Sequence, residues 1–158
     1  MTNLEKQQAP DFNLANEKGE QISLKDFAGE KYVVLYFYPK DMTPGCTTEA
    51  CDFRDAAEDF SQLDAVILGV SPDEAEDHTR FIEKHGLPFS LLVDSNHRVS
   101  EDYGVWVEKN RDGQKYMGIE RSTFLIDLQG TIIREWRKVN VENHIREVLE
   151  TLRTVQEQ

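Results

Sequence analysis

The segment from Tyr32 to Tyr38 constrains the fold most, because it is an unbroken run of aliphatic and aromatic residues. Runs of this kind are typical of a strand that is buried on both faces of a sheet. A helical stripe follows, in which apolar residues recur at spacings of four and three. The residues of this stripe are Cys46, Ala50, Phe53, Ala57 and Phe60. A buried strand that leads into an amphipathic helix predicts the first half of a βαβ unit.

The same alternation continues along the chain. Strands are expected at 65–70 and 89–93, and between them a helix at 73–85 that Gly86 ends. Beyond a short helix near 99–103, turn sequences with glycine separate short apolar segments, which predicts two β-hairpins. They pair 105–107 with 116–119, and 122–126 with 131–136.

Both ends of the chain carry recognisable elements. An N-terminal hairpin is expected between 12–14 and 21–24. The C-terminal segment is an amphipathic helix. Its apolar stripe consists of Val141, Ile145, Val148, Leu149, Leu152 and Val155.

These elements in this order predict an α/β fold of three layers. A central mixed β-sheet carries helices on both faces, with the N-terminal β-hairpin added to it. The order is compatible with a thioredoxin-like fold, although periodicity alone does not separate that fold from other three-layer α/β arrangements. The apolar segments are evenly spaced and show no repeat or linker, so residues 1–158 are expected to form a single domain.

Composition argues against several classes of partner. The chain has 18 basic and 30 acidic residues, a formal net charge of −12. Such a field repels phosphate backbones and anionic membrane surfaces, so neither nucleic acid nor a membrane is an expected partner. Cysteine is scarce, no apolar run is long enough to span a bilayer, and no secretory leader pattern follows Met1. These features favour a cytoplasmic protein.

Cys46 and Cys51 are the only cysteines, and Cys46 stands where the central strand gives way to the predicted helix. Thr43 suits the N-cap position and Pro44 the first helical position. Cys46 then lies in the first turn, where unpaired N–H groups and the helix dipole favour a thiolate over a thiol. The pair therefore indicates cysteine redox chemistry.

The spacing of the two cysteines restricts how they can react. On a regular helix they point about 140° apart, with Cα atoms roughly 8.6 Å from each other, whereas a disulfide requires a Cα separation below about 7 Å. Cys51 also shares its side of the helix with charged residues such as Arg54 and Glu58, while Cys46 lies on the apolar stripe. A bond between Cys46 and Cys51 therefore requires the first helical turns to unwind.

The motif Pro39-x-x-x-Thr43-x-x-Cys46, continued to Cys51, resembles the peroxidatic motif of peroxiredoxins, and most of all that of the bacterioferritin comigratory protein (PrxQ) subgroup. Further matches lie at 53–55, 69–73, 103–106 and 121–127. The resemblance covers nearly the whole chain. It implies a thioredoxin-like fold and the thiol-dependent reduction of hydrogen peroxide and organic hydroperoxides.

The resemblance also implies a role for each motif residue. Cys46 would be the peroxidatic cysteine, which attacks the peroxide and becomes a sulfenic acid. Cys51 would be the resolving cysteine, which condenses with that sulfenic acid to an intramolecular disulfide. Arg121 matches the active-site arginine, a fixed cation that donates hydrogen bonds to thiolate and peroxide. Thr43 would hold the substrate oxygen through its hydroxyl.

Three further residues would support this chemistry. Pro39 would shape the loop and shield the sulfur from water, and Glu49 would buttress the arginine. Backbone N–H groups around Gly45 and Cys46 would hold developing negative charge. Gly45 would also ease unwinding, because glycine stabilises a helix poorly.

The implied partners are a hydroperoxide and a dithiol donor, either thioredoxin or a glutaredoxin-like protein. No cofactor is implied, whether metal, flavin or haem. The chain is expected to be a monomer or a weak homodimer.

Other interpretations remain open at this point. A thiol–disulfide oxidoreductase would share the fold, but such proteins typically use Cys-x-x-Cys. A peroxide sensor or chaperone-like module would use oxidation of Cys46 to unfold the helix and expose apolar surface. A zinc site at the two cysteines would need two more ligands. The histidines show no ligand spacing with the cysteines and are expected at the surface. They are His78, His85, His97 and His144.

Overall fold

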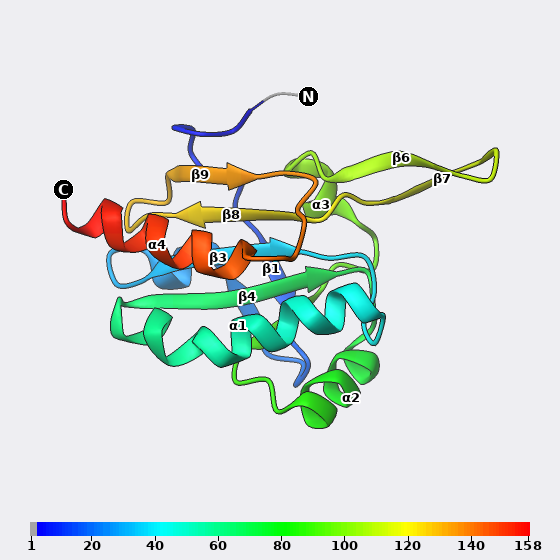
Figure 1. Cartoon of the computed structure of the whole chain (residues 1–158), viewed down its shortest axis with the longest axis horizontal. Helices are drawn as coiled ribbons and strands as arrows, with labels where there is room; N and C mark the ends of the chain where they lie inside the picture. The colour runs from blue at the N-terminus through cyan, green and yellow to red at the C-terminus, as the bar shows by residue number, and fades with distance from the viewer. Residues whose placement is uncertain (1–2) are drawn as a thin grey trace.

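A five-stranded mixed sheet forms the centre of the computed structural model, which describes residues 3–158 (Figure 1). The strand order is β5-β4-β3-β8-β9. The bounds are β3 (Tyr32–Phe37), β4 (Ala65–Ser71), β5 (Ser90–Val93), β8 (Ser122–Ile126) and β9 (Ile132–Trp136). The first three of these strands are parallel, while β8 pairs antiparallel with β3 and β9 antiparallel with β8. The predicted βαβαβ half and the hairpin that follows it are confirmed.

Two small antiparallel sheets accompany the central one. The first is the predicted N-terminal hairpin, β1 (Asn13–Ala15) with β2 (Gln21–Ser23). The second pairs β6 (Trp106–Arg111) with β7 (Gln114–Ile119), and this ribbon extends away from the body of the molecule (Figure 1). The strands of this ribbon are longer than the sequence pattern indicated.

The helices are a short 3₁₀ helix η1 (Leu24–Phe27), α1 (Pro44–Gln62), α2 (Ala75–His85), α3 (Arg98–Asp102) and α4 (His144–Gln156). Two boundaries differ from expectation. α2 begins at Ala75 and not at Asp73, whose carboxylate accepts hydrogen bonds from the Asp41 N–H and the Ser71 hydroxyl. Val141 precedes α4 instead of lying in it. Gly86 ends α2 in the left-handed region at φ 61°, as predicted.

Alternate residues of β3 face two separate hydrophobic clusters. Val34 and Tyr36 face a cluster that α1, α2 and α4 cover, whereas Val33 and Leu35 face one that includes α3, η1 and the N-terminal segment. Helices on both faces of the sheet make the three layers expected from the sequence. Within residues 3–158, none of the helices is both long and apolar enough to cross a membrane.

The register of the sheet brings distant parts of the chain to one edge. Phe37, the last residue of β3, pairs with Ser122, the first residue of β8, and with Val70 near the end of β4. Arg121 therefore lies beside the loop that leads from β3 into α1. The loop between β4 and α2 ends at the same edge, and the site forms where these segments meet.

Candidate active site

Cys46 lies in the first turn of α1, with Thr43 in the N-cap position and Pro44 as the first helical residue. Its side chain is 2% exposed and belongs to the same cluster as Phe53 and Phe60. The predicted inward stripe is therefore confirmed. The first N–H groups of a helix lack intrahelical partners, so they surround the sulfur with partial positive charge.

Arg121 bridges Cys46 and Glu49. One guanidinium nitrogen, Nη2, donates a hydrogen bond to Cys46 Sγ at 3.3 Å, and Nη1 donates to Glu49 Oε1 at 2.6 Å. Burial by itself lowers the pKa of Arg121, but the negative charges of Glu49 and Cys46 raise it above its usual value. The guanidinium therefore stays cationic within hydrogen-bond distance of the Cys46 sulfur.

Glu49 is a buried carboxyl group with one occupied oxygen. Burial raises the pKa of Glu49 from 4.5 to about 7, although the positive charge and hydrogen bond of Arg121 pull it down. The other oxygen, Oε2, has no hydrogen-bond partner among the described residues. Near neutral pH, Glu49 is therefore partly ionised, and it and the Cys46 sulfur contact the same guanidinium group of Arg121.

Thr43 differs in one respect from the expected cap. The side chain makes no capping hydrogen bond to the described part of α1, and its hydroxyl instead donates to the Lys40 carbonyl at 2.8 Å. The hydroxyl proton is therefore engaged in the hydrogen bond to Lys40 and is not free to be donated to a ligand. The two lone pairs of Oγ1 are left to accept a hydrogen bond from a ligand.

Gly45 has a steric reason for being glycine that the sequence did not reveal. A Cβ atom at this position would lie 3.2 Å from Nη2 of Arg121, so a side chain would push against the guanidinium. Its backbone is not in the left-handed region. Pro39, half-buried, follows the last residues of the buried run at the entrance to the loop.

Cys51 is half-buried and Cys46 buried, and both are free thiols. Both lie on one continuous helix, since α1 runs from Pro44 to Gln62. Next to Cys51 on the outer side, Arg54 donates a hydrogen bond to the His85 carbonyl at 2.8 Å. The two cysteines therefore have the unlike surroundings that their spacing predicted.

Sequence reasoning missed some residues near the site. His78 and His144, expected at the surface, are 0% and 4% exposed. Burial lowers the pKa of His144 to about 4, so its ring is neutral at pH 7. Its Nε2 atom lies 2.8 Å from the Thr123 hydroxyl.

Lys109 of β6 is close enough to the site to feel its charges. Burial and the positive charge of Arg121 lower the pKa of Lys109, and they outweigh the opposite effect of Glu120 and Cys46. No motif in the sequence marked Lys109.

The comparisons with known proteins agree with this geometry. The model of the AhpC/TSA family matches residues 6–135. The chain belongs to this family. Peroxiredoxin Bcp of Bacillus subtilis (strain 168) is 60% identical to it over 151 residues, covering 96% of each chain.

Two solved structures from Xanthomonas campestris are also similar to this peroxiredoxin. Peroxiredoxin Q superposes with a TM-score of 0.86 at 42% identity, covering 90% of each chain. A bacterioferritin comigratory protein, described for its alkyl peroxide reduction activity, gives 0.86 at 41% identity and the same coverage. The predicted peroxiredoxin family, its thioredoxin-like fold and thiol peroxidase activity are thereby confirmed.

Proposed function

We propose that this peroxiredoxin reduces hydrogen peroxide and organic hydroperoxides, alkyl hydroperoxides among them, with Cys46 as the peroxidatic cysteine. The observation that carries the proposal is the contact of Arg121 with both Cys46 Sγ and Glu49 Oε1, at 3.3 and 2.6 Å. A permanent cation against a buried sulfur at a helix N-terminus is the arrangement that activates a thiolate.

In the first step, the Cys46 thiolate attacks the terminal oxygen of the hydroperoxide. The S–O bond forms as the O–O bond breaks, and the leaving oxygen takes up a proton to become water or an alcohol. The lone pairs of Thr43 Oγ1 accept the hydroperoxide O–H. Arg121 and the N–H groups around Gly45 hold the charge that develops on the oxygens. Pro39 limits the access of water to the sulfur.

In the second step, the Cys51 thiolate attacks the sulfur of the Cys46 sulfenic acid. A disulfide forms, and the sulfenic oxygen leaves as water with a proton. Their positions on one helix put the two Cα atoms roughly 8.6 Å apart, so the start of α1 unwinds before the bond closes. The same requirement disfavours a thiol–disulfide oxidoreductase, in which the pair closes without unwinding.

A thiol reductant then returns the disulfide to two thiols. We assign this step to a dithiol protein of the thioredoxin or glutaredoxin type, because a disulfide at an unwound helix end is exposed to thiol attack. We also propose a reducing compartment such as the cytoplasm, because the sequence has only two cysteines. We further propose that residues 1–158 act as one domain, as a monomer or a weak homodimer.

Trapping the sulfenic acid in Cys51→Ser tests both cysteine roles. One equivalent of peroxide should leave a dimedone adduct on Cys46 in this variant and a Cys46–Cys51 disulfide in the wild type, both read by mass spectrometry. Cys46→Ser should give neither product. An adduct that fails to form in Cys51→Ser, with peroxide unconsumed, would overturn the proposal.

A steady-state assay separates the peroxidase from the oxidoreductase. Peroxide consumption with a thioredoxin system should be rapid, and reduction of insulin disulfides by the same preparation should be slow. Rapid insulin reduction without peroxide turnover would favour the oxidoreductase instead.

A further inference from the structure

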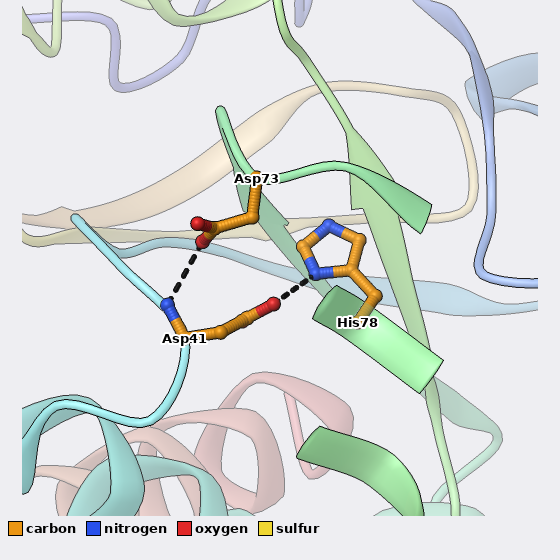
Figure 2. A group of neighbouring side chains, drawn as sticks. All are labelled: Asp41, Asp73 and His78. Carbon is orange, nitrogen blue, oxygen red and sulfur yellow. Dashed lines mark hydrogen bonds and ion pairs between the residues drawn. The ribbon is translucent and has the colours of Figure 1, made fainter. Parts of the chain in front are cut away.

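A second polar cluster lies beside the active-site loop, and none of its residues has a role in the chemistry above. It consists of Asp41 in that loop, Asp73 after β4, and His78 on α2 (Figure 2). His78 Nδ1 lies 2.6 Å from Asp41 Oδ2, and Asp73 Oδ2 accepts the Asp41 backbone N–H at 2.8 Å. His78 is 0% and Asp41 6% exposed.

The contacts of His78 require two ring protons. Nε2 lies 2.9 Å from the Leu92 carbonyl, which can only accept, so Nε2 carries a hydrogen. Nδ1 faces the Asp41 carboxyl group, whose other oxygen accepts the Tyr38 hydroxyl at 2.5 Å. Burial raises the pKa of Tyr38 well above its usual value, so this phenol remains a donor. One further proton must therefore lie between Nδ1 and Oδ2.

The same three side chains offer ligand atoms within 4.8 Å of one another, which raises the question of a metal. A separation of 2.6 Å between Nδ1 and Oδ2 is that of a short charge-assisted hydrogen bond. Two ligands on one ion, each about 2.0–2.2 Å from it, lie farther apart than this in a tetrahedral site. Asp73 Oδ2 is also occupied by the Ser71 hydroxyl at 2.7 Å. A proton fits this cluster, and a metal ion does not.

Asp41 anchors the loop that carries Thr43 through several hydrogen bonds. Three segments hold it: Tyr38 from the end of the β3 run, Asp73 from the loop after β4, and His78 from α2. The residues on either side depend on it. Lys40 supplies the carbonyl for the Thr43 hydroxyl. Met42 has a left-handed backbone at φ 67°, a strained conformation that persists only when its surroundings impose it.

We propose that Asp41 and His78 are positioning residues, which hold the loop before α1 closed through one shared buried proton and release the helix start when that proton is lost. The inference rests on the proposed function in one respect, the need for α1 to unwind before Cys51 reacts. Without the proton, lone pairs of Nδ1 and Oδ2 face each other at 2.6 Å. If the one remaining ring proton moved to Nδ1, the lone pair of Nε2 would instead face the Leu92 carbonyl oxygen at 2.9 Å.

The direction of the pH effect follows from the charges around the ring. Burial lowers the pKa of His78, but the hydrogen bond and charge of Asp41, the Leu92 carbonyl and the charge of Asp73 raise it above its usual value overall. Three further charged residues, Lys40, Asp77 and Arg80, line a pocket together with Asp41 and Asp73. A histidine with a raised pKa stabilises the folded state at low pH, and this contribution is lost as pH rises through that pKa. The loop should therefore loosen as pH rises.

Asp41→Asn tests the proposal by reversing the sign of this dependence. The new amide donates to a neutral Nδ1 and still accepts the Tyr38 hydroxyl, so the contact no longer needs the shared proton. Below the pKa of His78 the protonated ring then faces an amide N–H. The variant should hold the loop at high pH and loosen as pH falls, opposite to the wild type.

Two backbone amides report on the loop: Asp41 N–H, bonded to Asp73, and Thr47 N–H, bonded to the Thr43 carbonyl at 2.8 Å. Their exchange protection, corrected for intrinsic rates, should fall in the reduced wild type by up to about tenfold per pH unit between the ordinary pKa of histidine and the raised pKa of His78 in the closed loop, and should level off above it. In Asp41→Asn it should fall on acidification. These measurements need no peroxide, so they are independent of the peroxidase proposal.

Asp73→Asn is the matched control, because an amide oxygen still accepts the Asp41 N–H and the Ser71 hydroxyl. It should keep the wild-type sign. The same sign in the wild type and Asp41→Asn would overturn the proposal. So would NMR spectra of the wild type at pH 6 that show no hydrogen-bonded proton between His78 Nδ1 and Asp41, a measurement that does not depend on any variant.

Catalysis supplies the final readout. Disulfide formation after one equivalent of peroxide should be faster in the wild type than in Asp41→Asn, and the ratio of the two rates should grow with pH. The reaction of Cys51 itself is common to both proteins and cancels in this ratio. A ratio that does not change with pH would contradict the assignment of Asp41 and His78 to the resolving step.

Discussion

Two buried carboxyl groups flank the start of α1, and they are held in different ways. Glu49, inside the helix, contacts Arg121 of the β7–β8 connection, and Asp41, before the helix, contacts His78 of α2. Both contacts measure 2.6 Å. A guanidinium keeps its proton at any physiological pH, whereas an imidazole does not. The cation beside Glu49 is therefore permanent, whereas the proton at Asp41 is, in our proposal, removable.

The difference matches the demands made on each side of the helix start. In the proposed mechanism, the Arg121 side keeps a positive charge against Cys46 throughout attack on the peroxide. In the proposal above, the His78 side holds the loop during attack and releases it for resolution. A permanent cation suits the first task, and a removable proton suits the second.

The largest effect is expected from breaking the contact between Asp41 and His78. His78→Leu leaves the buried Asp41 without its cation and should lower the free energy of unfolding by about 3–5 kcal/mol at pH 7. Denaturant unfolding measures it. His144→Leu is the control, because that buried ring is neutral, with a pKa of about 4, and its loss should cost only about 1–2 kcal/mol. Equal losses would show that no ion pair is involved.

Removing the permanent cation should slow the chemistry. Arg121→Ala should reduce the rate of peroxide attack by about 10²–10³-fold, the usual effect of losing one preorganised donor. Single-turnover oxidation of Cys46 measures this rate. Arg121→Lys keeps the charge but not the fork that spans Cys46 and Glu49, so it should recover only part of the rate. Full recovery by lysine would make the bridging geometry irrelevant.

Ionisation of Glu49 should appear in the pH dependence of stability. Its pKa is about 7 in the folded protein against 4.5 ordinarily, so the folded state binds this proton more tightly. The free energy of unfolding should therefore fall as pH rises through this interval, by about 3 kcal/mol from this group.

Glu49→Gln isolates that contribution, because the amide accepts from Arg121 without ionising. The difference between wild-type and variant stability, measured by urea unfolding from pH 4 to pH 8, should change over this window. Parallel stability curves would contradict the assignment.

The smallest effect is expected at Gly45. Gly45→Ala places a Cβ 3.2 Å from Arg121 Nη2, and Arg121 cannot retreat freely because Glu49 holds its other nitrogen. Peroxide attack should slow by about threefold, and disulfide formation by a similar factor, since alanine strengthens the helix start. Thr48→Ala also raises helix propensity in this turn and has no such contact, so only its second step should slow. Slower attack in both variants would exclude the contact as the cause.

Local patterns predicted most of the fold. The apolar run at 32–38 and the stripe from Cys46 to Phe60 became β3 and α1, because burial of each depends on periodicity within the segment itself. Hairpins followed from turn chemistry in the same way. Boundaries were less accurate where a side chain had a tertiary partner, as at Asp73.

The site was predicted less completely, because its partners are distant in the sequence. Arg121 lies 75 positions from Cys46 and was identified only through family resemblance. His78 was wrongly expected at the surface, since its partner Asp41 lies 37 positions away. One signal was available: His78 precedes Phe81 by three residues, on the face of α2 that is buried.

The position of Phe53 sets how α1 recovers after each cycle. Phe53 is fully buried and stacks on Tyr36 with 4.5 Å between ring centroids, so we expect the helix beyond it to stay in place during the proposed unwinding of the first turns. Rewinding then extends a helix that already exists, which avoids the costly nucleus and takes on the order of nanoseconds per residue. In the proposed cycle, we therefore expect thiol exchange with the reductant, and not refolding, to limit the return to the reduced form.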